Sequence, residues 1–366
     1  MQIKNITCHD VYNHGASLQA YALQTYLSNL GHNVEIIDYK PDYLSGHYRL
    51  WSVDNSICDK PIVKQLYLLA KLPGRLIALR RKKAFDEFTR QYLRLTTTRY
   101  HSNEELKANP PKADVYIAGS DQIWNTLFQN GRDAAFYLDF APATSTRVAY
   151  AASFATSSVA EEYQTFVSKM LQNFDKVSIR EKDSLPLLAR LGRTDGVAVC
   201  DPVFLLTKEE WNDLLPSDRI SERYILVYDC ENSTAIKNIA KKVSKQHNIK
   251  IYNVSGKRLR YADKDFWASG PLAFVRLIRD AEYVVSNSFH ATAFSLIFEK
   301  EFCVVNRSEA INERMKSLLA DFGLENRLVS NDKELPSLSI DYSLVKTKIE
   351  EFIQESKYFL RQISNG

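Results

Sequence analysis

The sequence predicts an α/β protein with two Rossmann-like domains that face a central cleft, and three observations support this. The chain has 366 residues, of which 45% are hydrophobic, and this is enough for about two domains with a core each. Strand-like and helix-like segments alternate almost from end to end, which is typical of parallel sheets with crossover helices. Asp201-Pro202 and a stretch rich in turn-forming residues, 215–222, interrupt both patterns past the middle of the chain and mark the candidate domain boundary.

Residues 1–200 contain the elements expected of an N-terminal domain. A helix with an apolar stripe from Leu18 to Leu30 lies between the first two predicted strands. The predicted strands of this half are 3–8, 34–39, 115–118, 148–152, 177–179 and 197–199, with a further helix at 163–174. Residues 41–112 fit the alternation poorly, because aromatic and turn residues precede a basic helix there, and we expect an insertion.

Residues 201–340 repeat the same logic and predict a C-terminal Rossmann-like domain. Short β-branched or aromatic runs mark its strands, which we expect at 224–228, 249–254, 282–285 and 302–305. The remaining residues, 341–366, contain a last amphipathic helix at about 344–360. Its apolar side is formed by Val345, Ile349, Phe352 and Phe359. We expect this helix to pack across both domains.

Composition excludes several classes of protein. The chain has 48 Lys and Arg against 44 Asp and Glu, a formal net charge of +4, which is too dilute to indicate nucleic-acid binding. The five cysteines are scattered without a Cys-x-x-Cys pair, so neither a disulfide framework nor a zinc site is expected. The start lacks the order of a secretion signal, and no apolar run is long enough to span a bilayer. We expect a cytoplasmic protein that is soluble or at most peripheral to a membrane.

Polar side chains follow several of the predicted strands. In open parallel sheets, ligands bind beyond the carboxyl ends of the strands, where helix N-termini supply free N–H groups. The polar residues in these places are Asn13, Ser120, Asp121, Arg180, Ser288 and His290. A simpler interpretation stays open for most of them, because Ser and Asp at helix starts are often only caps. Their joint placement favours a site.

His290 carries the sharpest chemical signal, since it lies at a predicted helix N-terminus in the crevice between the domains. An imidazole there can exchange a proton near neutral pH, although a histidine bonded to backbone is the alternative. Arg180 stands at the sheet edge, where it can meet an anion or form a surface ion pair with a neighbour. His9 and His14 are more typical of polar loop residues, and their spacing gives no metal site; we expect no metal.

The segment 71–83 mixes cations with Leu and Ile at helical spacing. A solvated helix face is the first interpretation. The alternative hypothesis is a helix that touches anionic lipid or a lipid-diphosphate acceptor at the inner membrane surface.

The motifs at the strand ends resemble those of the polysaccharide pyruvyl transferase family. The resemblance covers residues 3 to about 330 and departs from the family at Ala291, where a glycine is usual. The matching stretches are Tyr12-Asn13-His14-Gly15-Ala16-Ser17-Leu18-Gln19-Ala20-Tyr21-Ala22-Leu23, Gly119-Ser120-Asp121-Gln122-Ile123-Trp124-Asn125, Ser178-Ile179-Arg180-Glu181, Asp201-Pro202 and Ser288-Phe289-His290-Ala291-Thr292-Ala293.

The resemblance implies a two-domain fold of the GT-B type that transfers the enolpyruvyl group of phosphoenolpyruvate to a sugar. The product would be a cyclic pyruvate ketal on a bacterial surface polysaccharide or its precursor, with phosphate released and with no metal or cofactor beyond this co-substrate. It makes His290 the proton donor and Asp121 the group that accepts the proton of the incoming hydroxyl. The donor would be bound by Arg180, Arg307, Asn13, Ser120 and Ser288.

The acceptor is less defined by the sequence. Tyr43, Tyr48 and Trp51 can stack on sugar rings, although aromatic loop residues also form local core. A lipid-linked oligosaccharide is one acceptor to consider. The chief rival function is a GT-B glycosyltransferase with a nucleotide-sugar donor, because a fold does not fix a function. A non-catalytic carbohydrate-binding or assembly protein is the third hypothesis.

Overall fold

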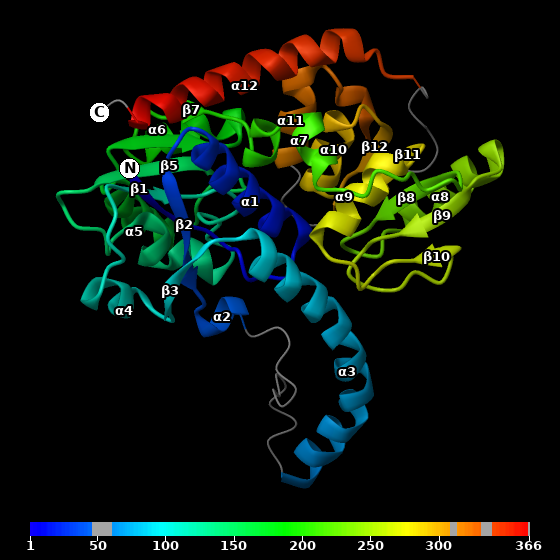
Figure 1. Cartoon of the computed structure of the whole chain (residues 1–366), viewed down its shortest axis with the longest axis horizontal. Coiled ribbons are helices and arrows are strands. Elements are labelled where there is room, and N and C mark those ends of the chain that lie inside the picture. The colour runs from blue at the N-terminus through cyan, green and yellow to red at the C-terminus, as the bar shows by residue number, and fades with distance from the viewer. Residues whose placement is uncertain (46–60, 308–312, 331–338, 365–366) are drawn as a thin grey trace.

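Two parallel sheets covered by helices form the frame of the protein (Figure 1). The structure is a computed structural model, and it describes residues 1–45, 61–307, 313–330 and 339–364. The predicted α/β class with two Rossmann-like halves is confirmed.

In the described residues the first sheet has seven strands in the order β3-β2-β1-β4-β5-β6-β7. Their bounds are β1 (Gln2–Ile6), β2 (Asn33–Tyr39), β3 (Leu95–Tyr100), β4 (Val115–Ala118), β5 (Thr146–Ala152), β6 (Lys176–Ile179) and β7 (Val197–Ala198). All pairings are parallel, and Ile6 lies opposite Ala118 in the register of β1 and β4. The segments that follow these strands therefore emerge at one edge of the sheet.

The second sheet, counted over the same described residues, has six parallel strands in the order β10-β9-β8-β11-β12-β13. They are β8 (Tyr224–Tyr228), β9 (Lys250–Asn253), β10 (Lys264–Asp265), β11 (Tyr283–Ser286), β12 (Glu301–Val305) and β13 (Leu328–Val329). β8 and β11 are wholly buried, which explains their continuous apolar runs, since helices cover both faces of such a sheet.

Helices connect the strands and cover the sheets. They are α1 (His14–Asn29), α2 (Asp42–Ser45), α3 (Pro61–Tyr92), α4 (Asn103–Ala108), α5 (Glu161–Leu171), α6 (Leu185–Arg190), α7 (Lys208–Asp213), α8 (Thr234–His247), α9 (Pro271–Asp280), α10 (Phe289–Ile297), α11 (Glu313–Phe322) and α12 (Tyr342–Ser364). One apolar core continues from α1 into the C-terminal half. There the Trp211 ring lies 5.9 Å from that of Tyr21 on α1 and 4.9 Å from that of Phe294 on α10. The two halves are therefore packed together by aromatic side chains.

The final helix, α12, crosses both halves of the molecule (Figure 1). Midway along it, Phe352 packs against Phe322 of α11. Near its end, Phe359 lies 6.2 Å from Tyr150 of β5, and the carbonyl of Gln362 accepts a hydrogen bond from the Lys176 side chain. The expected packing of a C-terminal helix across both domains is confirmed.

The segment expected to be an insertion, about 41–112, belongs in part to the first sheet. Leu95–Tyr100 forms the edge strand β3, which pairs with β2. The sequence LTTTRY has one large apolar residue before its final Tyr. An edge strand has less surface to bury, so it needs fewer apolar side chains. The periodicity of this segment was therefore too weak to indicate a strand. Among the described residues of this segment, α2 and α3 are the elements that fit the expectation of added structure.

Candidate functional site

The candidate site lies where the carboxyl ends of the two sheets approach each other. Arg180 follows directly after β6, and Asp201 stands shortly after β7, as the cap of a short helical turn. From the other sheet, β11 ends at Ser286 and α10 begins at Phe289. Residues from both halves therefore meet at this junction.

Arg180 is a buried cation surrounded by carboxylates. Its Nη1 donates to Asp201 Oδ2 at 2.8 Å, its Nε donates to Glu181 Oε1 at 3.1 Å, and Asp121 Oδ1 lies 3.9 Å from Nη1. Burial works to lower the pKa of Arg180, but Glu181, Asp201 and Asp121 outweigh burial and raise it. The guanidinium is therefore permanently charged, and its ion pair with Glu181 is buried rather than on the surface.

Asp201 joins the two halves through one carboxylate oxygen. The same Oδ2 that accepts from Arg180 lies 3.5 Å from Nε2 of His290. Burial works to raise the pKa of Asp201, but His290 and Arg180 together lower it to about 2. Asp201 is thus ionised at neutral pH, and it holds the imidazole and the guanidinium close to each other.

His290 is held in the first turn of α10 by a close contact with α1. A Cβ atom added to Gly15 would lie 1.9 Å from Nδ1 of His290, so the ring rests directly against the Gly15 backbone. The residue before it, Phe289, places its ring 4.3 Å below the Arg180 guanidinium, a favourable cation–π arrangement. His290 therefore packs against Gly15, and Phe289 packs against Arg180, so two residues of α10 contact the N-terminal half.

Three polar atoms of this cluster are buried without a hydrogen-bond partner. They are Nη2 of Arg180, Nε2 of His290 and Oε2 of Glu181. A buried donor without a partner costs about 1–3 kcal/mol, and such groups are rare unless a ligand or water satisfies them. Arg180 Nη2 can therefore donate to an oxygen atom of a bound molecule, whereas Glu181 Oε2 can only accept a hydrogen bond and His290 Nε2 lies beside Asp201.

Asp121 connects this cluster to a pocket in the N-terminal half. Its backbone has φ of 75°, an uncommon conformation for a residue with a side chain that is often found at functional sites. The side chain is 15% exposed and lines a pocket of about 410 Å³. The carboxylate of Asp121 thus lies near Arg180 and also lines the pocket.

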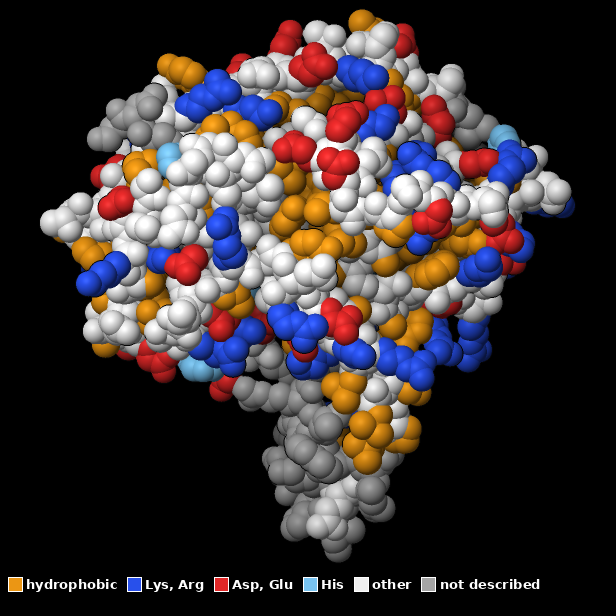
Figure 2. Space-filling model, in the orientation of Figure 1, with side chains coloured by type: hydrophobic (Ala, Val, Ile, Leu, Met, Phe, Trp, Pro, Cys, Tyr) orange, Lys and Arg blue, Asp and Glu red, His pale blue; other side chains and the backbone are white. Residues whose placement is uncertain are grey.

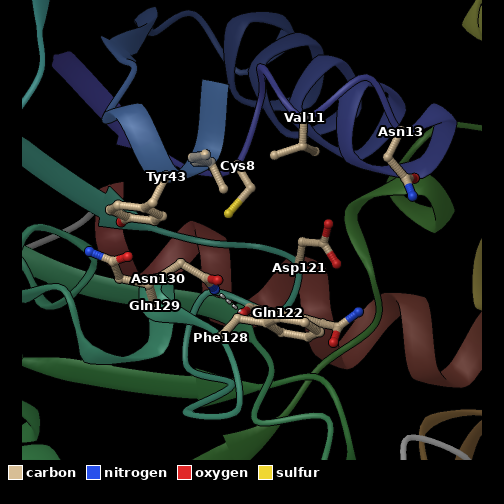
Figure 3. Close-up of a pocket in the computed structure, with 10 residues that line it drawn as sticks. Cys8, Val11, Asn13, Tyr43, Asp121, Gln122, Phe128, Gln129 and Asn130 are labelled. Carbon is tan, nitrogen blue, oxygen red and sulfur yellow. Dashed lines mark hydrogen bonds between the residues drawn. The ribbon is translucent and has the colours of Figure 1, made fainter. Parts of the chain in front are cut away.

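The pocket is lined by aromatic, amide and small apolar side chains. They are Cys8, Val11, Asn13, Tyr43, Leu44, Asp121, Gln122, Phe128, Gln129 and Asn130. Figure 3 shows the Cys8 thiol, the Tyr43 ring and the Asp121 carboxylate turned toward the same space, with Asn13 at one end of it. Among these described lining residues, Asp121 is the one charged side chain, so the pocket favours an uncharged molecule over a polyanion.

Three other residues predicted to bind the donor have identifiable structural places. Asn13 is exposed and caps α1, because its Oδ1 accepts from the N–H groups of Gly15 and Ala16. Ser120 is fully buried and its hydroxyl donates to the carbonyl of Ala151. Ser288 stands at the N-terminus of α10 without a side-chain capping bond. Of these three, Asn13 and Ser288 are open to a ligand.

Arg307 and Tyr43 pair with carboxylates outside the Arg180 cluster. Arg307 follows β12, and its Nε donates to Glu231 at 2.8 Å. Tyr43 lines the pocket while its hydroxyl donates to Asp133 at 2.6 Å, and burial together with Asp133 raises its pKa. Tyr48 and Trp51 lie outside the described residues.

His14 differs from the polar loop residue that was expected. It is completely buried and stacks on Phe274 of α9, with ring centroids 4.8 Å apart. Its Nε2 donates to the carbonyl of Ser269 at 3.0 Å. Burial lowers the pKa of His14 well below its ordinary value. This imidazole is therefore a neutral part of the contact between the two halves.

Neither a metal centre nor a membrane span emerges from the described part of the chain. Within it, no group of three or more His, Cys, Asp or Glu side chains is arranged to hold a metal ion. Among the helices it contains, none is both long and apolar enough to cross a bilayer.

Comparison with protein families decides the relationship that the motifs indicated. The family model for polysaccharide pyruvyl transferase matches residues 13–309. The chain belongs to the polysaccharide pyruvyl transferase family. The matched range includes Asn13, Asp121, Arg180, Asp201 and His290, so the family spans the whole junction. A search of curated proteins finds no match.

Solved structures share the fold of this pyruvyl transferase family member at low sequence identity. The UDP-GlcNAc 2-epimerase from Methanocaldococcus jannaschii is 12% identical, with a TM-score of 0.52 and full coverage of both chains. The S. aureus MnaA-UDP co-structure is also 12% identical, with a TM-score of 0.50, covering 96% of this chain and 88% of the other. The architecture is thus of the GT-B type shared by glycosyltransferases and such epimerases.

Sequence reasoning on this transferase missed several residues of the site. Asp201 was noted only as a motif and a candidate domain boundary, although its carboxylate joins Arg180 to His290. Its position shortly after a strand was the available signal. Gln122 was quoted only within a motif, and Phe128 and Asn130 gave no signal, because a pocket wall built from a loop has no periodicity.

Proposed function

We propose that this protein transfers the enolpyruvyl group of phosphoenolpyruvate to a sugar of a bacterial surface polysaccharide or its precursor. The product is a cyclic pyruvate ketal, and phosphate is released. Family membership supports the transferase class. The observation that carries the finer proposal is the shared carboxylate of Asp201, which lies 2.8 Å from Arg180 and 3.5 Å from His290.

In this proposal the donor binds through Arg180. Phosphoenolpyruvate presents a carboxylate and a phosphate, and Arg180 offers the unpartnered Nη2 to one of them in a site of low solvent access. Three carboxylates already offset the charge of Arg180, so further positive potential is needed. The uncapped N-terminus of α10 at Ser288 and the cation of Arg307 can supply it.

In this proposal His290 supplies the proton that starts the reaction. In the proposed route, the imidazole protonates the methylene carbon of the enol phosphate, and the adjoining carbon becomes an oxocarbenium-like centre. A sugar hydroxyl attacks that carbon and loses its proton to Asp121. Phosphate then leaves with its bonding electrons and takes up the proton from Asp121, and a second hydroxyl closes the ketal as its proton returns to His290. Asp201 keeps the ring oriented, in the manner of an acid–base pair.

The acceptor fits the pocket that Asp121 lines. The described lining residues contain no cation, whereas the amides of Asn13, Gln122 and Asn130 suit neutral hydroxyl groups. The ring of Phe128 is 50% exposed and can stack on a sugar.

Phe128→Ala should raise the KM for the acceptor with little change in melting temperature. The neighbouring Leu127→Ala, which changes a 61% exposed side chain outside the pocket lining, should not; equal effects of the two would refute this placement.

The decisive experiment measures phosphate release from phosphoenolpyruvate with a panel of sugar acceptors. His290→Gln should lower kcat by roughly 10²–10⁴-fold, while phosphoenolpyruvate still raises the melting temperature. Arg180→Lys should weaken that stabilisation, because a bidentate cation becomes a point charge. His247→Gln on the exposed end of α8 is the matched control. Normal turnover of both site variants would refute the proposal.

A thermal-shift screen separates this function from its rival. A ligand that binds the native state raises the melting temperature. Stabilisation by phosphoenolpyruvate but not by UDP or GDP favours pyruvyl transfer, and the reverse result favours a nucleotide-sugar glycosyltransferase.

We place the reaction in the cytoplasm.

A further inference from the structure

Helix α3 extends away from the body of the protein (Figure 1). It runs from Pro61 to Tyr92, and its C-terminal end contacts the rest of the molecule. There Arg81 is buried and donates to the carbonyls of Trp267 and Tyr12. One end of the helix is thus fixed to both halves, next to the loop that carries Asn13, while the other end projects outward.

The projecting part of α3 is strongly basic. Residues 61–85 contain seven cations and no Asp or Glu, in a chain whose total charges nearly balance. The cations are Lys64, Lys71, Arg75, Arg80, Arg81, Lys82 and Lys83. Arg81 is committed to the body, whereas Lys82 and Lys83 pair with Asp86 and Glu87 at the surface. Arg80 and Lys83 are exposed to solvent. Such a segment attracts a negatively charged surface.

Large apolar side chains are exposed beside these charges. Leu76 is 50% exposed and Ile77 is 44% exposed, and Arg80 and Lys83 are exposed one and two turns further along the helix. These four residues share one side, because positions three and four apart lie on the same side of a helix. Figure 2 shows hydrophobic and basic side chains next to one another on this helix.

Helix α8 provides an internal comparison, since it is also basic. Its residues Lys241 and Lys245 are exposed, but its apolar side chains Ile236, Ile239 and Val243 are buried in the core. A solvated basic helix thus hides its apolar residues, as α8 does. Because α3 exposes both kinds of side chain, solvation alone does not explain it.

We propose that α3 binds the surface of a membrane that contains anionic lipid. Leu76 and Ile77 enter the boundary between headgroups and acyl chains, and Arg80 and Lys83 lie over the phosphates, as in an interfacial helix. Because the inner end of α3 contacts Tyr12 beside Asn13, membrane binding brings the pocket that Asn13 lines close to the lipid surface. This inference stands on α3 alone and does not depend on the reaction proposed above.

The experiment is sedimentation of the full-length protein with vesicles. Wild type should pellet with mixed phosphatidylcholine and phosphatidylglycerol vesicles, less so at high salt, and should remain soluble with phosphatidylcholine alone. Arg80→Gln/Lys83→Gln should lower the partition coefficient, by roughly fivefold for each cation and so about 25-fold in total. Leu76→Ser/Ile77→Ser should also lower it. Lys241→Gln/Lys245→Gln on α8 changes the net charge equally and should bind as wild type.

Three results would overturn the proposal. Wild type that stays in the supernatant with anionic vesicles shows that α3 does not bind lipid. Equal losses in the α3 and α8 charge variants show an effect of net charge alone. Wild type that pellets without vesicles, with Leu76→Ser/Ile77→Ser restoring a monomer, assigns the exposed side of α3 to a second copy of the chain. Turnover on a soluble acceptor is expected to be unchanged in all these variants.

Discussion

The contact between Gly15 and His290 controls the geometry of the site. Any side chain at position 15 would overlap the imidazole, since even a Cβ would lie 1.9 Å from Nδ1. Gly15 lies in the first turn of α1, where alanine is otherwise the better helix former by about 0.5–1 kcal/mol. Glycine here therefore serves the packing of the ring and not the conformation of the helix.

The first prediction is that Gly15→Ala abolishes turnover while the protein stays folded. The added methyl group should push His290 away from Asp201, so kcat should fall by at least roughly 100-fold. Steady-state phosphate release and far-UV circular dichroism measure the two effects. Gly74→Ala is the matched control, because no atom lies within 4 Å of its Cβ. Unchanged kcat in Gly15→Ala would show that the ring position is not critical.

Among the helices, α12 ties the domains together from outside the junction. Its buried Ser356 accepts a hydrogen bond from the N–H of Cys200 at 2.8 Å, directly beside Asp201. The same hydroxyl donates to the carbonyl of Phe352. The helix therefore fixes the backbone that presents the shared carboxylate.

We predict that Ser356→Ala destabilises the protein by about 1–3 kcal/mol. The N–H of Cys200 would lose its partner while remaining buried, which costs the desolvation of that group. Urea unfolding followed by fluorescence gives the free energy. Ser343→Ala, at the exposed start of the same helix, should change stability by less than about 0.5 kcal/mol. Equal changes in the two variants would argue against this role for Ser356.

Across the whole molecule, the two halves are packed through a histidine that must stay neutral. His14 is enclosed by Phe274 and Tyr228 from the C-terminal half. Burial, with Arg81 nearby, holds its pKa well below 6.5 in the folded state. The unfolded chain takes up a proton at about pH 6.5, and the folded protein does not. Acid therefore favours unfolding as the pH falls through 6.5 toward the folded pKa.

The corresponding prediction concerns the pH dependence of stability. Wild type should lose stability between pH 7 and pH 5, and His14→Gln should show a shallower loss although it is less stable at pH 7. Melting temperatures across this range give the slope of stability against pH for each protein. The other histidines contribute equally to both slopes, so the difference between the slopes reports His14. Parallel slopes for the two proteins would show that His14 does not titrate in unfolding.

Local sequence signals were sufficient for most of the fold. The strands Val115–Ala118 and Tyr224–Tyr228 have the predicted bounds, because buried parallel strands leave continuous apolar runs. The apolar side of α12 was visible from its 3.6-residue period. Among the described residues, the strands that the sequence did not predict are β3, β10 and β13, which are short or exposed. A strand with little surface to bury leaves little apolar pattern in the sequence.

For the site, the order of residues along the chain shows which residue types follow each strand, and this was enough to select Arg180, Asp121 and His290. It did not determine that Asp201 joins two of them or that Gly15 supports the ring. Nor did it indicate the burial of His14. Those facts depend on distances between residues far apart in the chain. Periodicity records only whether a side chain faces a core, whereas packing of the two halves decides which side chains meet.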